Sequence, residues 1–292
     1  MKSVVLIAST GRPGMLHETL LALGRQTMPA GRILVSTVRE EDVEPASRTL
    51  PGCRFLTGAR GLCAQLNRAL RETAGDEELV FVFDDDVEPA ETYLAEMTRA
   101  FAENPGHVAL GGRVIHDGAR AQERWSREEA TRRLKERSTG MGARGRVEGD
   151  RQVLYGCSMA FRRRALLAEP FDEALPLYSW LFEVDLCRRL HRHGAVGQAG
   201  APVAHLASAR GKMSDQRMGY AQVANPYYLW RRRGTMAVTE FLRHTLTALA
   251  ANSLKMLVPG DPVDRVGRLR GNLLALLEIG LGKSEPGRIE RL

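Results

Sequence analysis

The stretch LVFVFDDDVEP, residues 79–89, joins a continuous apolar run to three consecutive carboxylates, Asp84, Asp85 and Asp86. A continuous run of β-branched and aromatic residues is typical of a strand in a parallel sheet, which is covered on both faces. Open α/β sheets bind ligands beyond the carboxyl ends of their strands. The stretch therefore predicts a buried strand that presents three acidic side chains where a ligand would bind.

Two earlier runs have the same character, VVLIA from residue 4 and ILV from residue 33. Apolar residues at helical spacing predict helices over 15–26 and 62–70, and Pro89 is expected in the first turn of a helix that runs to about residue 102. Strands and helices therefore alternate in this part of the chain. The alternation predicts an α/β fold with an open, mostly parallel twisted sheet flanked by helices.

The middle of the chain is less regular. Residues 153–161 and 195–206 are typical of strands, and residues 180–193 are typical of a helix. The arginine-rich segment 117–151 is charged and weakly periodic, so we expect a surface helix pair or a mobile insertion there.

The end of the chain is predicted to be helical. Residues 236–257 and 263–281 form two amphipathic patterns separated by the turn-forming sequence PGDP. We therefore expect one domain over residues 1–210 and a helical region over 211–292. The second helix carries arginines beside leucines, a pattern that suits an anionic membrane surface. Packing against the first domain, or against a second subunit of a homo-oligomer, explains the pattern equally well.

Composition limits the classes of function. A chain of 292 residues can bury a substantial core, and its 43% hydrophobic and 26% charged residues are typical of a globular protein. The formal charge of +7 favours polyanionic ligands such as nucleotide diphosphates, anionic lipids or nucleic acid. Aromatic residues make up only 6% and no nucleic-acid-binding motif is present, so we expect no nucleic-acid partner.

Cysteine usage and the N-terminus suggest where the protein resides. The four cysteines, Cys53, Cys63, Cys157 and Cys187, are widely spaced, which predicts neither a zinc site nor a disulfide framework. The first residues lack the apolar length of a signal peptide, and no stretch approaches the roughly 20 apolar residues of a membrane span. We therefore expect a cytoplasmic protein, with any peripheral contact at the inner face of the cell membrane.

The acidic triplet points to a metal ion. Neighbouring carboxylates raise one another's pKa unless a cation neutralises them. Oxygen-rich sites suit Mg²⁺ or Mn²⁺, which commonly complete their shells with substrate phosphates. The alternative is an acidic turn that caps the following helix. His205, in PVAHL, is a candidate further ligand, although a lone histidine is more often a core or surface residue.

Glu183 and Asp185, in WLFEVDLCRRL, are the candidate catalytic bases. Their spacing of two places them on different faces of a helix, so only one can easily point into a given cleft. Such a carboxylate can accept the proton of an attacking hydroxyl. The alternative is a pair of acidic residues that the helix dipole favours near its N-terminal end.

Taken together and in order, six segments resemble family 2 glycosyltransferases. They are IASTGRP (7–13), LCAQLNRAL (62–70), FVFDDDVEP (81–89), YGCSMAFRRRAL with FDEAL (155–175), FEVDLCRRL (182–190) and PVAHL (202–206). The resemblance spans residues 3–207 and leaves the C-terminal third outside it. It implies the GT-A fold, a nucleotide-diphosphate-sugar donor, and inversion of configuration at the anomeric carbon of the transferred sugar.

The resemblance also implies roles for individual residues. The implied metal ligands, for Mn²⁺ or Mg²⁺, are Asp84, Asp86 and His205. The residues implied at the donor nucleotide are Thr10, Arg12, Asp42, Arg60, Asn67, Asp84 and Asp85. Within this set, Asp85 is placed near the ribose and Asp42 is the candidate for a hydrogen bond to the nucleobase.

The chain departs from the family pattern at two places. STVREEDVEP at 36–45 replaces the Asp-Gly-Ser type of sequence that is common after the second strand, so the nucleotide stays open, with UDP as the default. Relatives commonly carry adjacent Glu and Asp in the base motif, where this chain has Phe182 and Glu183. Glu183 then takes the role of the base.

The implied reaction is a single in-line displacement. Glu183 takes the proton of the acceptor hydroxyl while a bound metal stabilises the departing nucleotide diphosphate. The expected acceptor is a glycan or a lipid-linked molecule of cell-envelope or exopolysaccharide synthesis. Two alternatives stay open. One is a sugar-phosphate nucleotidyltransferase, which needs a glycine-rich phosphate loop that SVVLIASTGRPG matches poorly; the other is a noncatalytic nucleotide-sugar-binding relic.

Overall fold

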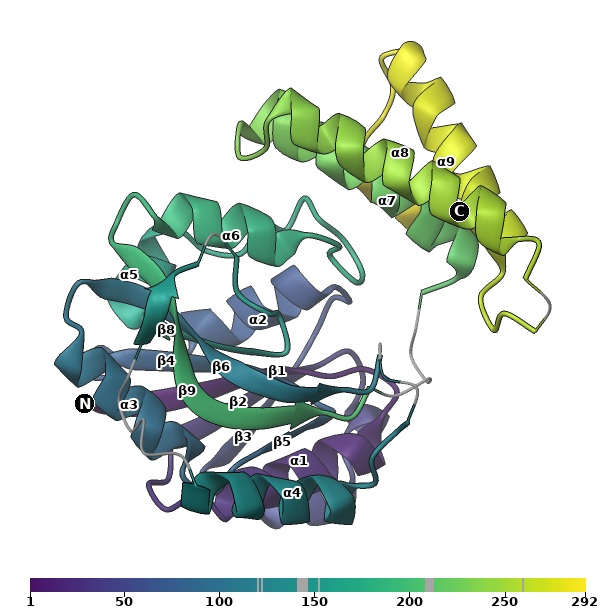
Figure 1. Ribbon diagram of the computed structural model, residues 1–292. Helices are drawn as coiled ribbons and strands as arrows, with labels where there is room; N and C mark the ends of the chain where they lie inside the picture. Colours follow the sequence, from purple (N-terminus) through teal and green to yellow (C-terminus); the bar gives the residue numbers. More distant parts are fainter. Residues whose placement is uncertain (120, 122, 141–146, 152, 208–212, 259) are drawn as a thin grey trace. The chain divides into compact units, whose positions relative to one another are not determined.

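A computed structural model describes the chain except for residues 120, 122, 141–146, 152, 208–212 and 259. The structure divides into two compact units, which are described in turn (Figure 1). The first unit comprises residues 1–60, 65–171 and 186–211, and the second comprises residues 61–64, 172–185 and 212–292.

The first unit is built on one sheet, and its first four strands are parallel. They are β1 (Ser3–Ala8), β2 (Arg32–Thr37), β3 (Cys53–Thr57) and β4 (Leu79–Asp84), in the order β3-β2-β1-β4. The strands predicted from residues 4, 33 and 79 are confirmed. β3 escaped prediction because none of its residues is buried, and its sequence CRFLT lacks a continuous apolar run.

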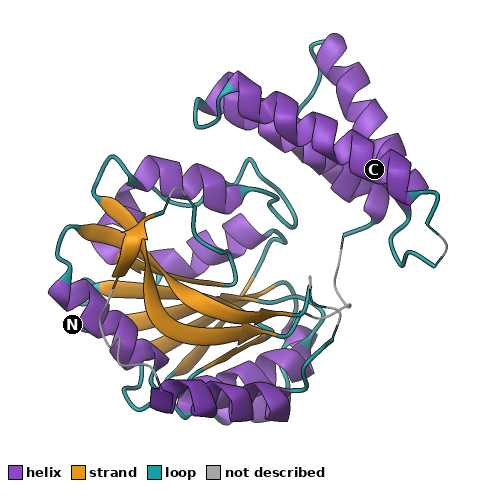
Figure 2. Ribbon diagram, viewed as in Figure 1, coloured by secondary structure: helices purple, strands orange, loops and turns teal. Residues whose placement is uncertain are grey.

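The sheet continues beyond β4 with strands of mixed direction (Figure 2). The order is β4-β8-β6-β9-β5, and β7 pairs with β9. These strands are β5 (Val87–Pro89), β6 (His107–Asp117), β7 (Val147–Asp150), β8 (Ser158–Arg162) and β9 (Ala195–His205). β8 runs antiparallel to both β4 and β6, whereas β6 and β9 are parallel. The predicted α/β sheet is confirmed. Three of the four strands at its parallel end, β1, β2 and β4, are those that the apolar runs predicted.

The prediction for Pro89 is wrong. Pro89 ends β5, where it lies opposite Val203 of β9, and the following helix begins only at Tyr93. β5 lies at the end of the strand order, and an edge strand tolerates proline because one row of its backbone groups needs no partner in the sheet. Pairing with β9 therefore places Pro89 in a strand, although the local sequence favours the first turn of a helix.

Helices cover the sheet of the first unit. They are α1 (Pro13–Gly24), α2 (Leu62–Arg71), α3 (Tyr93–Glu103), α4 (Arg127–Gly140), α5 (Arg163–Ala168) and α6 (Phe182–Leu190), with 3-10 turns at Glu40–Asp42 and Pro45–Thr49. The first residues of α2 and α6, 62–64 and 182–185, belong to the second unit. The helices predicted over 15–26, 62–70 and 180–193 correspond to α1, α2 and α6. In the segment 117–151, the described residues form α4 and β7 instead of a helix pair.

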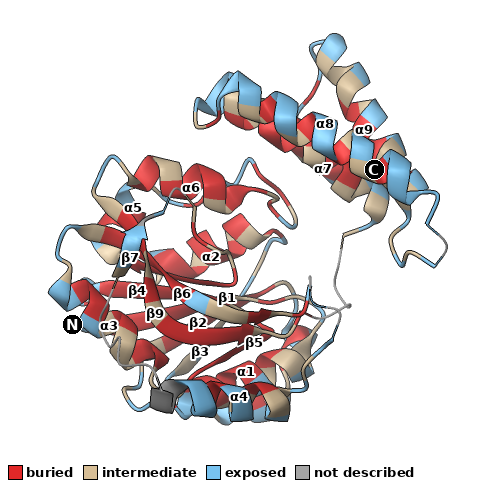
Figure 3. Ribbon diagram, viewed as in Figure 1, coloured by how far each residue is buried: buried red, intermediate tan, exposed pale blue. Residues whose placement is uncertain are grey.

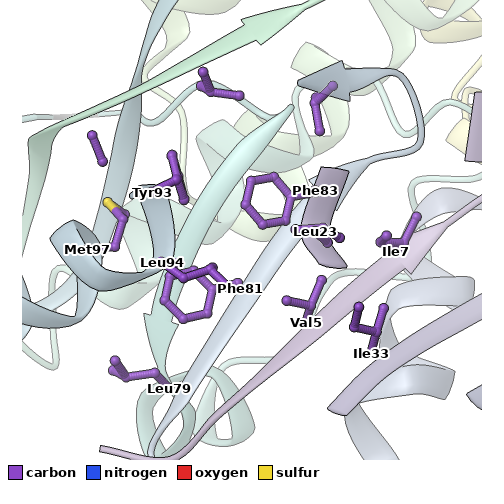
Figure 4. Packing of buried hydrophobic residues seen from close by; sticks show 14 of the residues in the cluster. Val5, Ile7, Leu23, Ile33, Leu79, Phe81, Phe83, Tyr93, Leu94 and Met97 are labelled. Atoms are coloured by element: carbon purple, nitrogen blue, oxygen red, sulfur yellow. The ribbon is translucent and has the colours of Figure 1, made fainter. Parts of the chain in front are cut away.

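The main core of the first unit lies between the sheet and its helices (Figure 4). Phe81 and Phe83 of β4 are fully buried and lie near Tyr93, Leu94 and Met97 of α3. Burying aromatic and aliphatic side chains on this scale is the principal stabilising term for such a unit. β4 is thereby held rigidly up to the residue at which its acidic sequence begins.

The second unit contains three long helices, and the first of them was not predicted. They are α7 (Asp215–Tyr228), α8 (Val238–Lys255) and α9 (Arg265–Gly280), with a π-helical turn η3 at Leu229–Arg233 and a final 3-10 helix η4 at Pro286–Arg291. α7 and α9 approach at Gly219 and Gly271, where an added Cβ would lie about 2 Å from backbone oxygen of the other helix. α7 escaped prediction because its hydrophobic face is interrupted by glycine, glutamine and asparagine.

Exposed apolar residues on α8 and α9 contrast with the buried β-sheet (Figure 3). Within the described part of the chain, no helix is both long enough and apolar enough to cross a membrane.

Candidate active site

The end of β4 and the end of β9 bring together two carboxylates and a histidine. Asp84 is the last residue of β4, and β5 then returns antiparallel to β9, with Val87 opposite His205. The backbone N–H of Leu206 donates to the carbonyl of Asp86 over 2.9 Å. As a result, one ligand atom from each of Asp84, Asp86 and His205 lies within 4.8 Å of the other two.

The ionisation of this cluster reflects an excess of negative charge. His205 Nε2 is 3.4 Å from Asp86 Oδ1 and 3.9 Å from Asp84 Oδ2. Desolvation and the neighbouring Asp86 raise the pKa of Asp84 to about 6. Burial opposes the charged imidazolium, but the carboxylates around His205 outweigh it and raise the pKa of His205 to about 9. At neutral pH the two carboxylates thus hold a proton on His205, which a bound metal ion would have to displace.

The cluster fits a divalent metal ion. Two carboxylates and an imidazole supply two oxygen ligands and one nitrogen ligand, a set that suits Mn²⁺ and that leaves further positions for phosphate oxygens. Carboxylates whose pKa is raised by crowding are stabilised when a cation neutralises them. Asp84, Asp86 and His205 are therefore the residues that would hold the ion.

Sequence reasoning missed the residues that orient His205. Asp117, the last residue of β6, accepts a hydrogen bond from His205 Nδ1 over 2.9 Å and another from the Tyr155 hydroxyl over 2.5 Å. Although burial alone would raise the pKa of Asp117, these hydrogen bonds lower it below its ordinary value. An Nδ1–H held by a carboxylate leaves Nε2 as the ligand atom, as is usual for metal-binding histidines. No signal in the sequence identified Asp117, because β6 was not predicted and Asp117 only begins the charged segment 117–151.

Asp85 points to a different set of partners. The Ser9 hydroxyl donates to Asp85 Oδ2 over 2.5 Å, and the Arg12 guanidinium forms an ion pair with Asp85 and a 2.8 Å hydrogen bond with Asp86. The Thr19 hydroxyl donates to the Asp85 backbone carbonyl. Asp85 is fully buried, and burial raises its pKa to about 7 despite the nearby Arg12. Arg12 therefore links the loop after β1 to both carboxylates.

The loops after β1 and β2 are joined by Asp42. Its side chain accepts hydrogen bonds from the backbone N–H groups of Gly11, Val38 and Arg39, and it is 1% exposed. These bonds favour a structural role for this carboxylate. Its predicted hydrogen bond to a nucleobase stays a prediction that this geometry does not favour. Thr10 lies in the same loop, partly buried, and its hydroxyl donates to the Ser9 carbonyl.

Asn67 and Arg60 occupy contrasting places. The Asn67 amide exchanges two hydrogen bonds with the backbone of Phe171 and is 6% exposed, so it fastens α2 to the segment after α5. Arg60 is exposed at the end of the loop that follows β3. The nucleotide-binding roles of both residues stay predictions.

The candidate bases Glu183 and Asp185 lie in the first turn of α6 and belong to the second unit. Asp185 is fully buried, accepts a 2.9 Å hydrogen bond from the Thr235 hydroxyl and lies 3.3 Å from Arg233 Nε. Glu183 is partly buried. The partners of Asp185 give it a structural task, and the catalytic role of either carboxylate stays a prediction.

Comparison with solved structures identifies the class of protein. The chain is similar to the mannosyltransferase PcManGT from Pyrobaculum calidifontis in complex with GDP-Man and Mn²⁺, with 17% identity, a TM-score of 0.56, and coverage of 99% of this chain and 84% of that one. It is also similar to S. aureus TarS 1-349 in complex with UDP-GlcNAc, with 14% identity, a TM-score of 0.59, and coverage of 100% and 84%. The chain spans 44% of the longer TarS structure, at 13% identity and a TM-score of 0.54. The fold is that of the GT-A glycosyltransferases.

The family follows from the sequence itself. Residues 4–168 match the profile of glycosyl transferase family 2, and this match covers more than half of the chain. The chain therefore belongs to glycosyl transferase family 2 and is a glycosyltransferase, which decides against the nucleotidyltransferase alternative. No curated protein matches the chain.

Proposed function

We propose that the protein is a metal-dependent, inverting transferase that moves a sugar from a nucleotide-diphosphate donor to an acceptor hydroxyl. The observation that carries the proposal is the cluster of Asp84, Asp86 and His205 at the carboxyl edge of the sheet, where α/β folds bind nucleotides. A Mn²⁺ or Mg²⁺ ion bound there would supply positive charge to the diphosphate as it leaves.

The residues of the first unit would prepare the donor site. Asp84, Asp86 and His205 hold the cation in place, and Asp117 fixes the histidine ring that would otherwise rotate. Arg12, which pairs with Asp85 and Asp86, lessens the repulsion between the two carboxylates and positions them. Groups fixed in this way stabilise a developing charge without rearranging during the reaction.

The acceptor hydroxyl would lose its proton to Glu183. A carboxylate can do this when its geometry and its pKa suit the proton transfer. Asp185 is committed to Arg233 and Thr235, whereas Glu183 occupies the position that the family resemblance assigns to the base. The oxygen then attacks the anomeric carbon from the side opposite the leaving group, which inverts its configuration.

The donor would be a nucleoside-diphosphate sugar. Structures similar in fold contain GDP-Man with Mn²⁺ in one case and UDP-GlcNAc in another, so neither base is excluded by the fold. UDP remains the default for this chain.

Calorimetric titration of GDP, UDP, ADP and TDP, with and without Mn²⁺, tests the proposal. We expect one nucleotide to bind wild type only when Mn²⁺ is present, and this binding to be lost in Asp86→Ala and His205→Ala. Asp76→Ala, at an exposed ion pair with Lys2, is the matched control and should bind as wild type does. Nucleotide binding that needs no metal, or that survives both substitutions, would contradict the proposal.

A second proposal concerns the acceptor, which we place at the inner face of a cell membrane, in the synthesis of an envelope glycan. Large apolar side chains are exposed along α8, along α9 and in the turn between them: Val238, Leu242, Leu246, Leu254, Met256, Leu257, Val258, Val266, Leu273, Leu277 and Leu281. Residues 212–292 carry 13 Lys and Arg against 7 Asp and Glu. Apolar side chains accompanied by excess positive charge suit an anionic lipid surface.

Cosedimentation of the full chain with phosphatidylglycerol vesicles tests this placement. We expect wild type to sediment and the double variant Leu254→Ser, Leu257→Ser to remain largely in solution, because these side chains are 70% and 77% exposed. The control Leu167→Ser changes an exposed leucine of the first unit. If the double variant sediments as wild type does, the membrane proposal fails. Light scattering on both proteins would show whether the same residues join two copies of the chain.

A further inference from the structure

The segment between Pro176 and Phe182 has an unusual backbone. Leu177, Ser179 and Leu181 have φ values of 55°, 53° and 70°, in the left-handed region that non-glycine residues rarely adopt. Elsewhere among the described non-glycine residues, only Ala207 has a positive φ. Each such residue is costly, and strain of this kind persists only where the surroundings enforce it.

The surroundings enforce this backbone through hydrogen bonds that are buried or partly buried. The Leu177 carbonyl accepts from the N–H of Leu62 over 2.8 Å, and the Ser179 hydroxyl donates to the Leu175 carbonyl over 2.6 Å. Asn225, fully buried on α7, donates from its side-chain amide to the Trp180 carbonyl over 2.9 Å. Several independent contacts thus fix the path of five residues.

The consequence of this path is an aromatic side chain presented to solvent. Leu177 and Trp180 pack against the apolar cluster formed by α7, α9 and η4, whereas Tyr178, which lies between them in sequence, is 58% exposed. The Tyr178 and Trp180 rings lie 6.5 Å apart between centroids, with 21° between their planes. Tyr178 is the most exposed aromatic residue among the large hydrophobic side chains of the described chain. A strained, well-anchored segment therefore exposes a ring that stability alone would bury.

The segment also leads directly into the catalytic helix. Phe182, the first residue of α6, donates its N–H to the Ser179 carbonyl over 2.9 Å, so the strained turn ends where α6 begins. Glu183 follows in the first turn of that helix. A group that binds next to Tyr178 is thereby connected to the proposed base through a short and rigid stretch of backbone.

We propose that Tyr178 and Trp180 form a binding platform for a pyranose ring of the acceptor. This inference rests on the proposed function, because it takes Glu183 as the base. One face of a pyranose presents C–H groups and its rim presents hydroxyls, which suits an aromatic side chain with an apolar face and a polar edge. Pockets for small molecules combine such apolar surfaces with a few polar groups that fix orientation. The donor groups proposed above all belong to the first unit, so the platform is assigned to the acceptor.

Saturation-transfer NMR tests the platform without knowledge of the natural acceptor. The probes are the methyl β-glycosides of glucose, galactose, mannose and N-acetylglucosamine. We expect at least one glycoside to receive saturation from wild type, most strongly at the ring protons of a single face. Tyr178→Ala should reduce this transfer at least fivefold, and Tyr178→Phe, which keeps the ring, should retain most of it. Leu246→Ala, a change at another exposed side chain of the second unit, should leave it unchanged.

Two results would overturn the inference: no transfer to any of the four glycosides, or equal transfer from wild type and Tyr178→Ala. Because Tyr178 is exposed and its own φ is ordinary, these substitutions should not disturb folding, which circular dichroism would verify. Calorimetry of nucleotide and Mn²⁺ binding on the same variants separates this inference from the proposed function. Nucleotide binding should be identical in wild type and Tyr178→Ala; a wild type that binds a glycoside but no nucleotide would refute the donor site alone.

Discussion

Removing the carboxylate of Asp117 should weaken metal binding although Asp117 is not a metal ligand. Asp117 Oδ1 accepts the hydrogen bond from His205 Nδ1 over 2.9 Å, and its other oxygen is occupied by the Tyr155 hydroxyl. Asp117→Asn keeps an acceptor for Nδ1–H, removes the charge, and replaces the oxygen that accepts from Tyr155 with an NH2 group. Asp117→Ala removes both the acceptor and the charge, so the ring of His205 loses its orientation and its fixed tautomer.

The expected size of the effect follows from this geometry. A hydrogen bond to a charged group contributes about 1.5–3 kcal/mol, and loss of such a partner typically lowers metal affinity about 10- to 100-fold. We expect Asp117→Ala to fall within this range and Asp117→Asn to lie near its lower end. Tyr155→Phe, which removes only the donor to Asp117, should lower affinity by less than about tenfold.

Isothermal titration with Mn²⁺ at pH 8.5 is the assay. The pKa of His205 is about 9, so at pH 8.5 the metal still displaces a proton from its ring, but this competition is weaker than at neutral pH. Asp76→Asn serves as the control, since its side chain is 60% exposed and pairs with Lys2 on the surface. Mn²⁺ affinity within twofold of wild type in Asp117→Ala, measured beside an Asp86→Ala variant that no longer binds, would refute the reasoning.

Three further results are expected. Without metal, the free energy of unfolding should fall as pH rises from 5 to 9. The folded protein binds a proton more tightly than the unfolded chain at Asp84 and at His205, and the stability from these protons is lost as pH rises through about 6 and about 9, respectively. Thermal melts should therefore show that Mn²⁺ raises Tm more at pH 8 than at pH 6. Gly118→Ala should lower the free energy of unfolding by about 1–3 kcal/mol and weaken Mn²⁺ binding, because the added Cβ would lie 2.4 Å from the carbonyl oxygen of Leu206, the residue after His205. An unchanged midpoint in urea melts would contradict this. Glu183→Gln should lower kcat about 100-fold or more. Asp185→Asn should lower Tm more than Glu183→Gln does, because Asp185 is fully buried and accepts a hydrogen bond from Thr235; a larger loss of kcat in Asp185→Asn than in Glu183→Gln would exchange their roles.

The acidic strand end shows how far local sequence information reaches. LVFVF predicted β4 correctly because a strand covered on both faces needs an uninterrupted apolar run, whatever its neighbours are. The position of Asp84 at the end of that strand followed at once. By contrast, Asp42 was assigned to the nucleobase from its place in a motif, and only the folded loops show that three backbone N–H groups already occupy it.

The sequence by itself determined the α/β class, the parallel strands and the acidic triplet, because these depend on periodicity and on the order of residues within short windows. Only the tertiary structure decided which distant residues meet. The pairing of β5 with β9 places His205 beside Asp86 and turns Pro89 into a strand residue, and the end of β6 delivers Asp117 to the far side of the imidazole. These contacts depend on the register between strands that are far apart in the chain, and the local pattern of apolar and polar residues does not specify that register.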